Sequence, residues 1–173
     1  MELKQLIRDI PNFPKEGIVF KDITTLLKDS SGFQETLNEL YNLSKDKKIT
    51  KVLGIESRGF ILGGALAAKL GVGFVPIRKP GKLPAEIISE AYELEYGFDK
   101  IELHKDALNK NDRVLIHDDL LATGGTMNAA CKLVEKLGAQ VEQISFIIEL
   151  DFLKGRELLK DYDVKSLIHY EGE

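Results

Sequence analysis

Short apolar runs alternate along this chain with segments of helical periodicity. Five runs have the length and composition of buried strands, namely residues 52–55, 73–77, 114–117, 141–148 and 164–168. Apolar residues at helical spacing fill two of the intervening segments, residues 59–70 and 126–137. Strands that alternate with helices predict an α/β fold, with a mainly parallel sheet and helices on both faces.

Two stretches interrupt this alternation, and we expect them to form a hood (residues 1–30) and a flap (residues 79–103) on the sheet. The hood begins with apolar residues at the spacing of an amphipathic helix: Leu3, Leu6, Ile7 and Ile10. Just after the hood, Ser31 and Gln34 have the spacing of a capping box, which predicts the start of another helix. The flap contains two extended segments that meet near Tyr96, which predicts a projecting β-hairpin.

The composition fits a single folded domain over residues 1–173. Apolar residues make up 43% of the chain, and charged residues make up 30%. The net charge of −4 excludes a general basic field that would hold nucleic acid or an anionic membrane. No apolar run approaches the ~20 residues that span a bilayer. Cys131 is the only cysteine, so no internal disulfide can form and a cytoplasmic location is expected.

The segment after the third apolar run, residues 118–126 (DDLLATGGT), carries the strongest chemical signal. Ligands of open α/β sheets bind beyond the carboxyl ends of the strands, where this segment must lie. Gly124 and Gly125 allow the backbone to approach a phosphate group closely and to turn N–H groups towards it. The following helix adds the positive end of its dipole, and Thr123 and Thr126 add hydroxyl donors.

Asp118 and Asp119 begin the same segment but cannot serve a phosphate, because like charges repel. Their carboxylates can instead accept hydrogen bonds from vicinal ribose hydroxyls of the same ligand. A strand, two acids and a glycine-rich turn together predict a site for a phosphorylated ribose, whereas the glycine-rich turn alone would be compatible with an ordinary surface loop.

This loop resembles the signature of the type I phosphoribosyltransferases, which bind 5-phosphoribosyl 1-pyrophosphate. Four further segments resemble that family in the same order: residues 19–24 (VFKDIT), 56–60 (ESRGF), 78–84 (RKPGKLP) and 94–97 (LEYG). The resemblance covers nearly the whole chain. Two departures are His117, where the family usually has an aliphatic residue, and Thr25, where proline is common. Neither residue is expected to contact a ligand.

The resemblance implies which residues bind the two ends of 5-phosphoribosyl 1-pyrophosphate, its phosphoribosyl group and its pyrophosphate. The phosphoribosyl group would lie on the loop after the third strand, at Asp118, Asp119, Ala122, Thr123, Gly124, Gly125 and Thr126. The pyrophosphate would lie at Ser57, Arg58, Arg78, Lys79 and Lys82, the last three acting in the same subunit or across the interface of a homodimer. The peptide bond before Ser57 is often cis in this family. Mg2+ is expected as a cofactor that the pyrophosphate and ribose carry, without direct protein ligands.

The resemblance further implies a purine base as the second substrate. The base would stack between Phe20 and Leu120, and backbone groups of Val19 and Lys21 would read its edge and select adenine. The expected reaction is salvage of the purine by transfer of the phosphoribosyl group, giving AMP and pyrophosphate.

Three residues are expected to assist the chemistry by the same resemblance. Glu95, at the tip of the flap, would handle the proton at the purine's other ring nitrogen. Tyr96 would help to close the site to water. The guanidinium of Arg58 would supply positive charge where the pyrophosphate leaves.

Alternatives remain open at this stage. The base could instead be hypoxanthine, guanine or xanthine, or the chain could be a regulator that senses a ligand without turnover. The residues alone leave Phe20 evenly balanced between a core residue and a base platform, and they favour an exposed hairpin charge for Glu95. His117 is expected to be a core histidine with a backbone partner, and Cys131 a packing residue.

Overall fold

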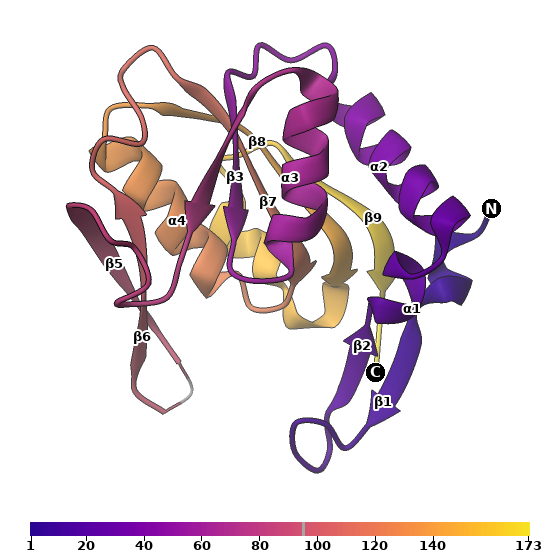
Figure 1. The fold of residues 1–173 in the computed structure, drawn as a ribbon. Coiled ribbons are helices and arrows are strands. Elements are labelled where there is room, and N and C mark those ends of the chain that lie inside the picture. Colours follow the sequence, from indigo (N-terminus) through magenta and orange to yellow (C-terminus); the bar gives the residue numbers. More distant parts are fainter. Residues whose placement is uncertain (95) are drawn as a thin grey trace.

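The computed structural model describes residues 1–94 and 96–173, and a parallel sheet forms its centre (Figure 1). The strands are β3 (Lys51–Ile55), β4 (Gly73–Ile77), β7 (Arg113–Leu121), β8 (Gln140–Leu150) and β9 (Val164–Tyr170). They lie in the order β4-β3-β7-β8-β9, and every neighbouring pair is parallel. The predicted strands are confirmed, and β7 continues beyond its apolar run to include Asp118 and Asp119.

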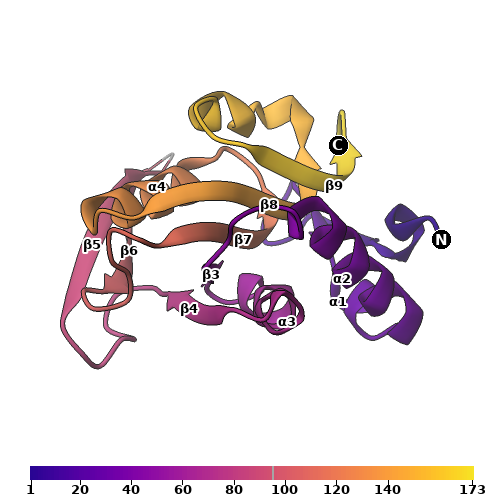
Figure 2. The same ribbon diagram turned by 90° about the horizontal axis from the view of Figure 1, so that it is seen from above.

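Alternate residues of the central strands pack into two cores on opposite faces of the sheet, because successive side chains of a strand point to opposite sides. Leu53 of β3 packs with α4 (Gly125–Lys136), whereas its neighbour Val52 packs with α2 (Ser30–Ser44) and α3 (Gly59–Leu70). Viewed from above, α4 lies on one side of the curved sheet and α2 and α3 lie on the other (Figure 2). The predicted α/β fold with helices on both faces is therefore confirmed.

The predicted flap is confirmed as a β-hairpin of β5 (Ile87–Glu93) and β6 (Phe98–His104) (Figure 1). Its base belongs to the α4 core, since Ile101 and Leu103 are fully buried there. A bridge between Arg78 and Glu102 also connects the hairpin to the chain after β4. Only the tip projects, and Tyr96 at the tip is 86% exposed.

The predicted amphipathic helix at the N-terminus is wrong beyond its first turn. Residues Leu3–Leu6 form a 3-10 turn, η1, and Arg8–Pro11 then form β1, which pairs with β2 (Val19–Asp22) in an antiparallel hairpin. Ion pairs from Arg8 to Asp22 and from Lys21 to Asp9 cross this hairpin. A helix through Ile10 would leave β2 without its partner, and helical spacing within residues 3–10 carries no information about that distant strand.

The predicted start of α2 is confirmed, but the predicted capping box is wrong. Asp29 is the N-cap, and its carboxylate accepts a hydrogen bond from the N–H of Gly32 at 2.7 Å. Ser31 lies exposed within the first turn. A Cβ atom on Gly32 would lie 2.5 Å from Leu6 Cδ1, so α2 begins in direct contact with η1.

Three short helices complete the fold. The first, α1 (Thr24–Leu27), precedes α2, and η2 (Asp151–Leu153) and η3 (Gly155–Leu159) connect β8 to β9. The connection leaves β8 at the carboxyl end of the sheet, close to the start of α4 (Figure 1). Within the described residues, no helix is both long and apolar enough to cross a membrane.

Candidate active site

The turns that follow β3 and β7 meet at the carboxyl edge of the sheet. These two strands are parallel neighbours, with Gly54 opposite His117. A direct contact joins the two turns, because Arg58 Nε donates to Asp119 Oδ2 at 2.5 Å. The structure thus brings together the residues that the sequence assigned to the pyrophosphate and to the ribose.

The loop between β7 and α4 encloses a small cavity of about 90 Å³. Most of the residues assigned to the phosphoribosyl group line it, namely Asp118, Ala122, Thr123, Gly124, Gly125 and Thr126. Gly124 has a φ of 89° and precedes the first residue of α4, so a left-handed residue turns the chain into the helix. The first N–H groups of a helix have no partner within the helix, which makes the start of α4 suited to an anion.

Asp118 and Asp119 lie side by side but have different surroundings. Asp119 is buried and pairs with Arg58, whereas Asp118 Oδ1 accepts a hydrogen bond from the Asp119 N–H at 2.8 Å. Burial, and then the charge of Asp119, raise the pKa of Asp118 well above its usual range. A Cβ atom on Gly59 would lie 3.0 Å from Asp118 Oδ1, so only glycine lets α3 begin this close to the carboxylate.

Arg58 connects three of the predicted subsites. Besides its ion pair with Asp119, its guanidinium lies over the ring of Phe20, with Cζ 5.0 Å from the ring centroid. Phe20 also makes an edge contact with Phe13, at 5.2 Å between centroids. In this arrangement the guanidinium covers a ring face of Phe20 and engages one acceptor of Asp119. The contact joins the β2 side of the site to the loop after β7.

The turn after β3 has a feature that the sequence reasoning missed. Glu56 accepts a hydrogen bond from Arg78 Nη2 at 3.0 Å and another from the backbone N–H of Lys79 at 2.8 Å. The peptide bond between Glu56 and Ser57 is cis. Glu56 therefore fixes the start of the 78–84 segment against the turn that carries Ser57. The available signal was an acid directly after a buried strand, with basic residues after the neighbouring strand.

The basic residues at the base of the flap have unequal environments. Lys79 Nζ donates to Asp99 at 2.5 Å and to the Tyr92 hydroxyl at 3.0 Å, so its ammonium is engaged within the flap. Arg78 pairs with Glu56, and Lys82 is exposed. The structure brings Arg78 to the turn after β3, whereas the side chain of Lys79 points to the hairpin.

The outer edge of β2 presents backbone groups at a fixed spacing. Pro11, which has no N–H, lies opposite Val19, and the Ile18 carbonyl accepts the hydrogen bond from Phe13 that closes the hairpin. Because backbone groups alternate in direction along a strand, the N–H and C=O groups of Val19 and Lys21 face away from β1. No described strand pairs with that edge. The Lys21 side chain is buried and pairs with Asp9, so only its backbone remains for a ligand.

Two of the three residues assigned to catalysis, Glu95 and Tyr96, belong to the flap segment (residues 79–103). Glu95 lies outside the described residues. Tyr96 is exposed, and it is not among the residues that line the cavity of the β7–α4 loop. Leu120, the other residue assigned to the base, is half-buried and lines the cavity beside Asp118.

His117 is a core residue, as expected, and its side chain has a partner on the neighbouring strand β8. Its side chain is fully buried, and Nδ1 lies 2.9 Å from the hydroxyl of Ser145 on β8. Ser145 is the register partner of His117 on the parallel strand β8, so the pattern of a single strand cannot predict this hydroxyl. Burial lowers the pKa of His117 to about 4, so the ring is neutral at physiological pH.

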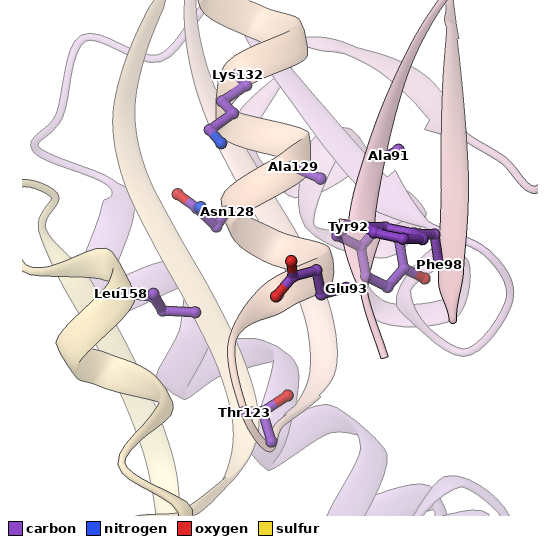
Figure 3. A pocket seen from close by; sticks show the side chains of 10 residues that line it. Ala91, Tyr92, Glu93, Phe98, Thr123, Asn128, Ala129, Lys132 and Leu158 are labelled. Atoms are coloured by element: carbon purple, nitrogen blue, oxygen red, sulfur yellow. The ribbon is translucent and has the colours of Figure 1, made fainter. Parts of the chain in front are cut away.

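A larger cavity of about 510 Å³ lies beside the β7–α4 loop, between the flap, α4 and η3. Figure 3 shows Tyr92 and Phe98 from the flap, Lys132 from α4 and Leu158 from η3 around it. Thr123 lies at its lower end in this view. No sequence pattern indicates this cavity, because its walls come from segments far apart in the chain.

Among the described residues, one group of possible metal ligands lies at the carboxyl ends of β8 and β9. The ligand atoms of Glu149, Asp151 and His169 all lie within 4.8 Å of one another. Glu149 already accepts hydrogen bonds from Arg156 and from Ser166. A cation at this position would have to displace those donors.

Comparisons with known proteins agree with this geometry. The family model of the phosphoribosyl transferase domain matches residues 23–171. Among curated proteins, an adenine phosphoribosyltransferase of Bacteroides fragilis is 56% identical over 170 residues, and the match covers 96% of each chain.

Two solved structures show how closely the fold corresponds. The crystal structure of adenine phosphoribosyltransferase from Thermoanaerobacter pseudethanolicus has a TM-score of 0.95 and 54% identity over 98% of both chains. The enzyme from Saccharomyces cerevisiae, complexed with D-2,5-dideoxy-2,5-imino-altritol 1,6-bisphosphate and adenine, has a TM-score of 0.90 and 45% identity over 96% of both chains.

Proposed function

Because this chain belongs to the phosphoribosyltransferase family, we propose that it transfers the 5-phosphoribosyl group of 5-phosphoribosyl 1-pyrophosphate to adenine, giving AMP and pyrophosphate. The observation that carries the proposal is the meeting of three parts at one sheet edge: the cavity of the β7–α4 loop, the Arg58 guanidinium and the unpaired edge of β2. The match to adenine-specific relatives over nearly their whole length supports adenine as the base.

In this proposal the β7–α4 loop binds the phosphorylated ribose. The 5′-phosphate accepts hydrogen bonds from N–H groups between Ala122 and Thr126, and the start of α4 adds its dipole. The ribose hydroxyls donate to Asp118, which lines the same cavity, and to its neighbour Asp119. Charge-assisted hydrogen bonds of this kind are stronger than neutral ones, which favours both acids being ionised when the ribose is bound.

The pyrophosphate binds beside the turn after β3, at Ser57 and Arg58. When the pyrophosphate binds, Arg58 leaves Asp119 and contacts the pyrophosphate instead. The Asp119 carboxylate is then available to the ribose hydroxyls, and the ring of Phe20 is uncovered for the base. Arg78, Lys79 and Lys82 add positive charge, either in the same subunit or from the second subunit of a homodimer. The engagement of Lys79 with Asp99 and Tyr92 favours a role for Lys79 after movement of the flap.

Adenine stacks between Phe20 and Leu120 and meets the outer edge of β2. Its amino group donates to a backbone carbonyl, and its adjacent ring nitrogen accepts from a backbone N–H. Val19 and Lys21 supply these two backbone groups. Hypoxanthine carries a carbonyl oxygen in place of the amino group and would face that backbone carbonyl with a second acceptor. Selection by backbone groups therefore favours adenine over 6-oxopurines.

The reaction forms a bond between a purine ring nitrogen and C1 of the ribose and breaks the bond from C1 to pyrophosphate, while the base loses one proton. Glu95 handles the proton at the purine's other ring nitrogen, and Tyr96 excludes water when the flap closes. Arg58 stabilises the charge that grows on the leaving pyrophosphate.

Mg2+ fits this site as an ion carried by the substrate. In the proposed complex Glu56 is paired with Arg78, and Asp119 accepts from the ribose hydroxyls, so phosphate and ribose oxygens are the better ligands. When bound, Mg2+ would neutralise part of the pyrophosphate charge. We further propose a cytoplasmic homodimer. The buried Cys131, the only cysteine, is compatible with a reducing compartment.

The direct test is turnover of adenine with 5-phosphoribosyl 1-pyrophosphate and Mg2+, followed by chromatography of the products. We expect AMP and pyrophosphate in equal amounts, and neither product when one substrate is omitted. Binding of both substrates without AMP formation would instead indicate a ligand-sensing protein of the same fold.

A further inference from the structure

The phosphate loop rests directly on Gly155, the first residue of η3. A Cβ atom on Gly124 would lie 2.6 Å from the Gly155 carbonyl oxygen. A Cβ atom on Gly155 would lie 2.3 Å from the carbonyl oxygen of Ala122 and 2.9 Å from Leu121 Cδ1. The two segments therefore meet backbone to backbone, and neither glycine leaves room for a side chain.

An ion pair next to this contact fixes the position of Gly155. Arg156 Nε and Nη2 donate to the two carboxylate oxygens of Glu149 at 2.9 and 2.6 Å, which is a two-pronged contact. Arg156 Nη1 also donates to the Val164 carbonyl at 2.9 Å, and Ser166 donates to Glu149 at 2.6 Å. Arg156 thus ties η3 to the ends of both β8 and β9.

The other end of η3 is anchored in the core. Leu159 is fully buried in the cluster that includes the apolar face of α4. Gly155 is consequently held from both sides while it supports Ala122 and Gly124. In Figure 3, η3 with Leu158 runs beside the loop that carries Thr123.

We infer that Gly155, held by the ion pair between Arg156 and Glu149, is a positioning residue that sets the conformation of the phosphate loop for the 5′-phosphate. The loop binds through backbone N–H groups, whose directions depend on the support beneath them. A Cβ atom on Gly155, only 2.3 Å from the Ala122 carbonyl oxygen, would displace the loop and turn those groups away from the phosphate. The inference rests on the proposed function, because it assigns the 5′-phosphate to this loop.

The test compares two probes that each carry one end of the substrate. Ribose 5-phosphate has the 5′-phosphate and no pyrophosphate, whereas inorganic pyrophosphate should need only the turn after β3. Calorimetric titration of the full chain with each probe separates the two subsites. The principal variant is Gly155→Ala, and the matched control is Gly172→Ala, since a Cβ atom there meets nothing within 4 Å.

We expect Gly155→Ala to weaken ribose 5-phosphate at least ~10-fold, because misplacement by about 1 Å can cost ~100-fold in a preorganised site. Pyrophosphate affinity should stay within about twofold of wild type. In turnover, the KM for 5-phosphoribosyl 1-pyrophosphate should rise while the KM for adenine does not. Gly172→Ala should match wild type with both probes.

A second variant keeps the inference testable if Gly155→Ala does not fold. Arg156→Ala removes the ion pair without adding an atom and should weaken ribose 5-phosphate selectively, whereas Glu157→Ala on the same exposed turn should not. Unchanged ribose 5-phosphate affinity in either folded test variant, or equal loss for both probes, would overturn the inference. Failure of the wild-type chain to bind ribose 5-phosphate would instead contradict the proposed function.

Discussion

At the scale of single residues, the two adjacent acids near the end of β7 differ in how well the folded protein stabilises their negative charge. Asp119 has a cation, Arg58, as its ion-pair partner, whereas Asp118 is half-buried beside another carboxylate and has no ion-pair partner among the described residues. A carboxylate whose pKa is raised in the folded state destabilises the folded chain at neutral pH. The ribose hydroxyls would supply the donors that Asp118 lacks. The negative charge of Asp118 should therefore lower the stability of the ligand-free protein and strengthen binding of the ligand.

This opposition gives a pH-dependent prediction for Asp118→Asn. The carboxyl group ionises near pH 3.8 in the unfolded chain and at a raised pKa in the folded chain. The free energy of unfolding therefore falls as the pH rises through the interval between these two values, and it stays lowered above them. Asn is neutral throughout and can still accept the hydrogen bond from the Asp119 N–H. We expect a melting temperature a few degrees higher near pH 7, since ~1 kcal/mol corresponds to about 2–4 °C at this size.

The difference should shrink as the pH falls towards 3.8 and vanish well below it, where Asp118 is neutral in both states. Affinity for 5-phosphoribosyl 1-pyrophosphate should fall in the same variant. A melting temperature equal to or below that of wild type at neutral pH would show that Asp118 is not a destabilising charge.

The geometry of Arg58 predicts that its charge alone is insufficient. Lysine at this position keeps the positive charge but loses the planar fork that matches phosphate oxygens and the flat face that lies over Phe20. We expect Arg58→Lys to lower kcat/KM at least ~10-fold, about the value of one charge-assisted hydrogen bond. Arg113→Lys is the matched control, because Arg113 pairs with Glu142 at the opposite end of β7. Equal kinetics in both variants would remove Arg58 from the site.

At the scale of elements, the flap and the β1–β2 hairpin flank the same edge of the sheet (Figure 1). The base of the flap is packed into the α4 core, and its tip is exposed, so movement is expected at the tip only. A residue that reaches the site only upon closure can stabilise the transition state more than the bound product. This reasoning places the catalytic contribution of the flap in kcat.

We therefore expect Glu95→Gln to lower kcat much more than it weakens AMP. Positioned proton transfer contributes ~100- to 10,000-fold, and Gln cannot carry the proton. Glu86→Gln, at an exposed position before β5, is the control. Steady-state turnover and an AMP titration on each variant give the answer. A change in kcat below about threefold would leave Glu95 as an exposed hairpin charge.

The start of α2 offers a stability prediction without a functional component. Removing an N-cap side chain costs about 1 kcal/mol, so Asp29→Ala should lower the melting temperature by about 2–4 °C. Ser31→Ala should change it little, because the Ser31 side chain is not the cap. Thermal unfolding of the two variants distinguishes them, and adenine turnover should be unaffected in both. A larger fall in melting temperature for Ser31→Ala than for Asp29→Ala would indicate that Ser31 is the N-cap, as the capping box predicts.

At the scale of the whole molecule, the sequence predicts those features that depend on local periodicity. The apolar runs and helical faces determine the α/β sheet, and the 118–126 segment lies at the expected edge. The N-terminal strand β1 could not be predicted, because its pairing partner begins at Val19 and its own residues have helical spacing. The contacts of Glu56 with Arg78 and of Gly155 with the β7–α4 loop could not be predicted for the same reason, because each joins segments that are distant in the sequence.

The central claim, that an adenine-selective site forms where the β7–α4 loop meets the edge of β2, is tested most directly by the ratio of kcat/KM for adenine to that for hypoxanthine. Both bases are assayed with 5-phosphoribosyl 1-pyrophosphate and Mg2+ under the same conditions. A site that hydrogen-bonds its substrate rejects an unsuited analogue by up to ~10,000-fold or more, so we predict a ratio of at least ~1,000. A ratio near one, or a preference for hypoxanthine, would contradict the reading of the base by Val19 and Lys21.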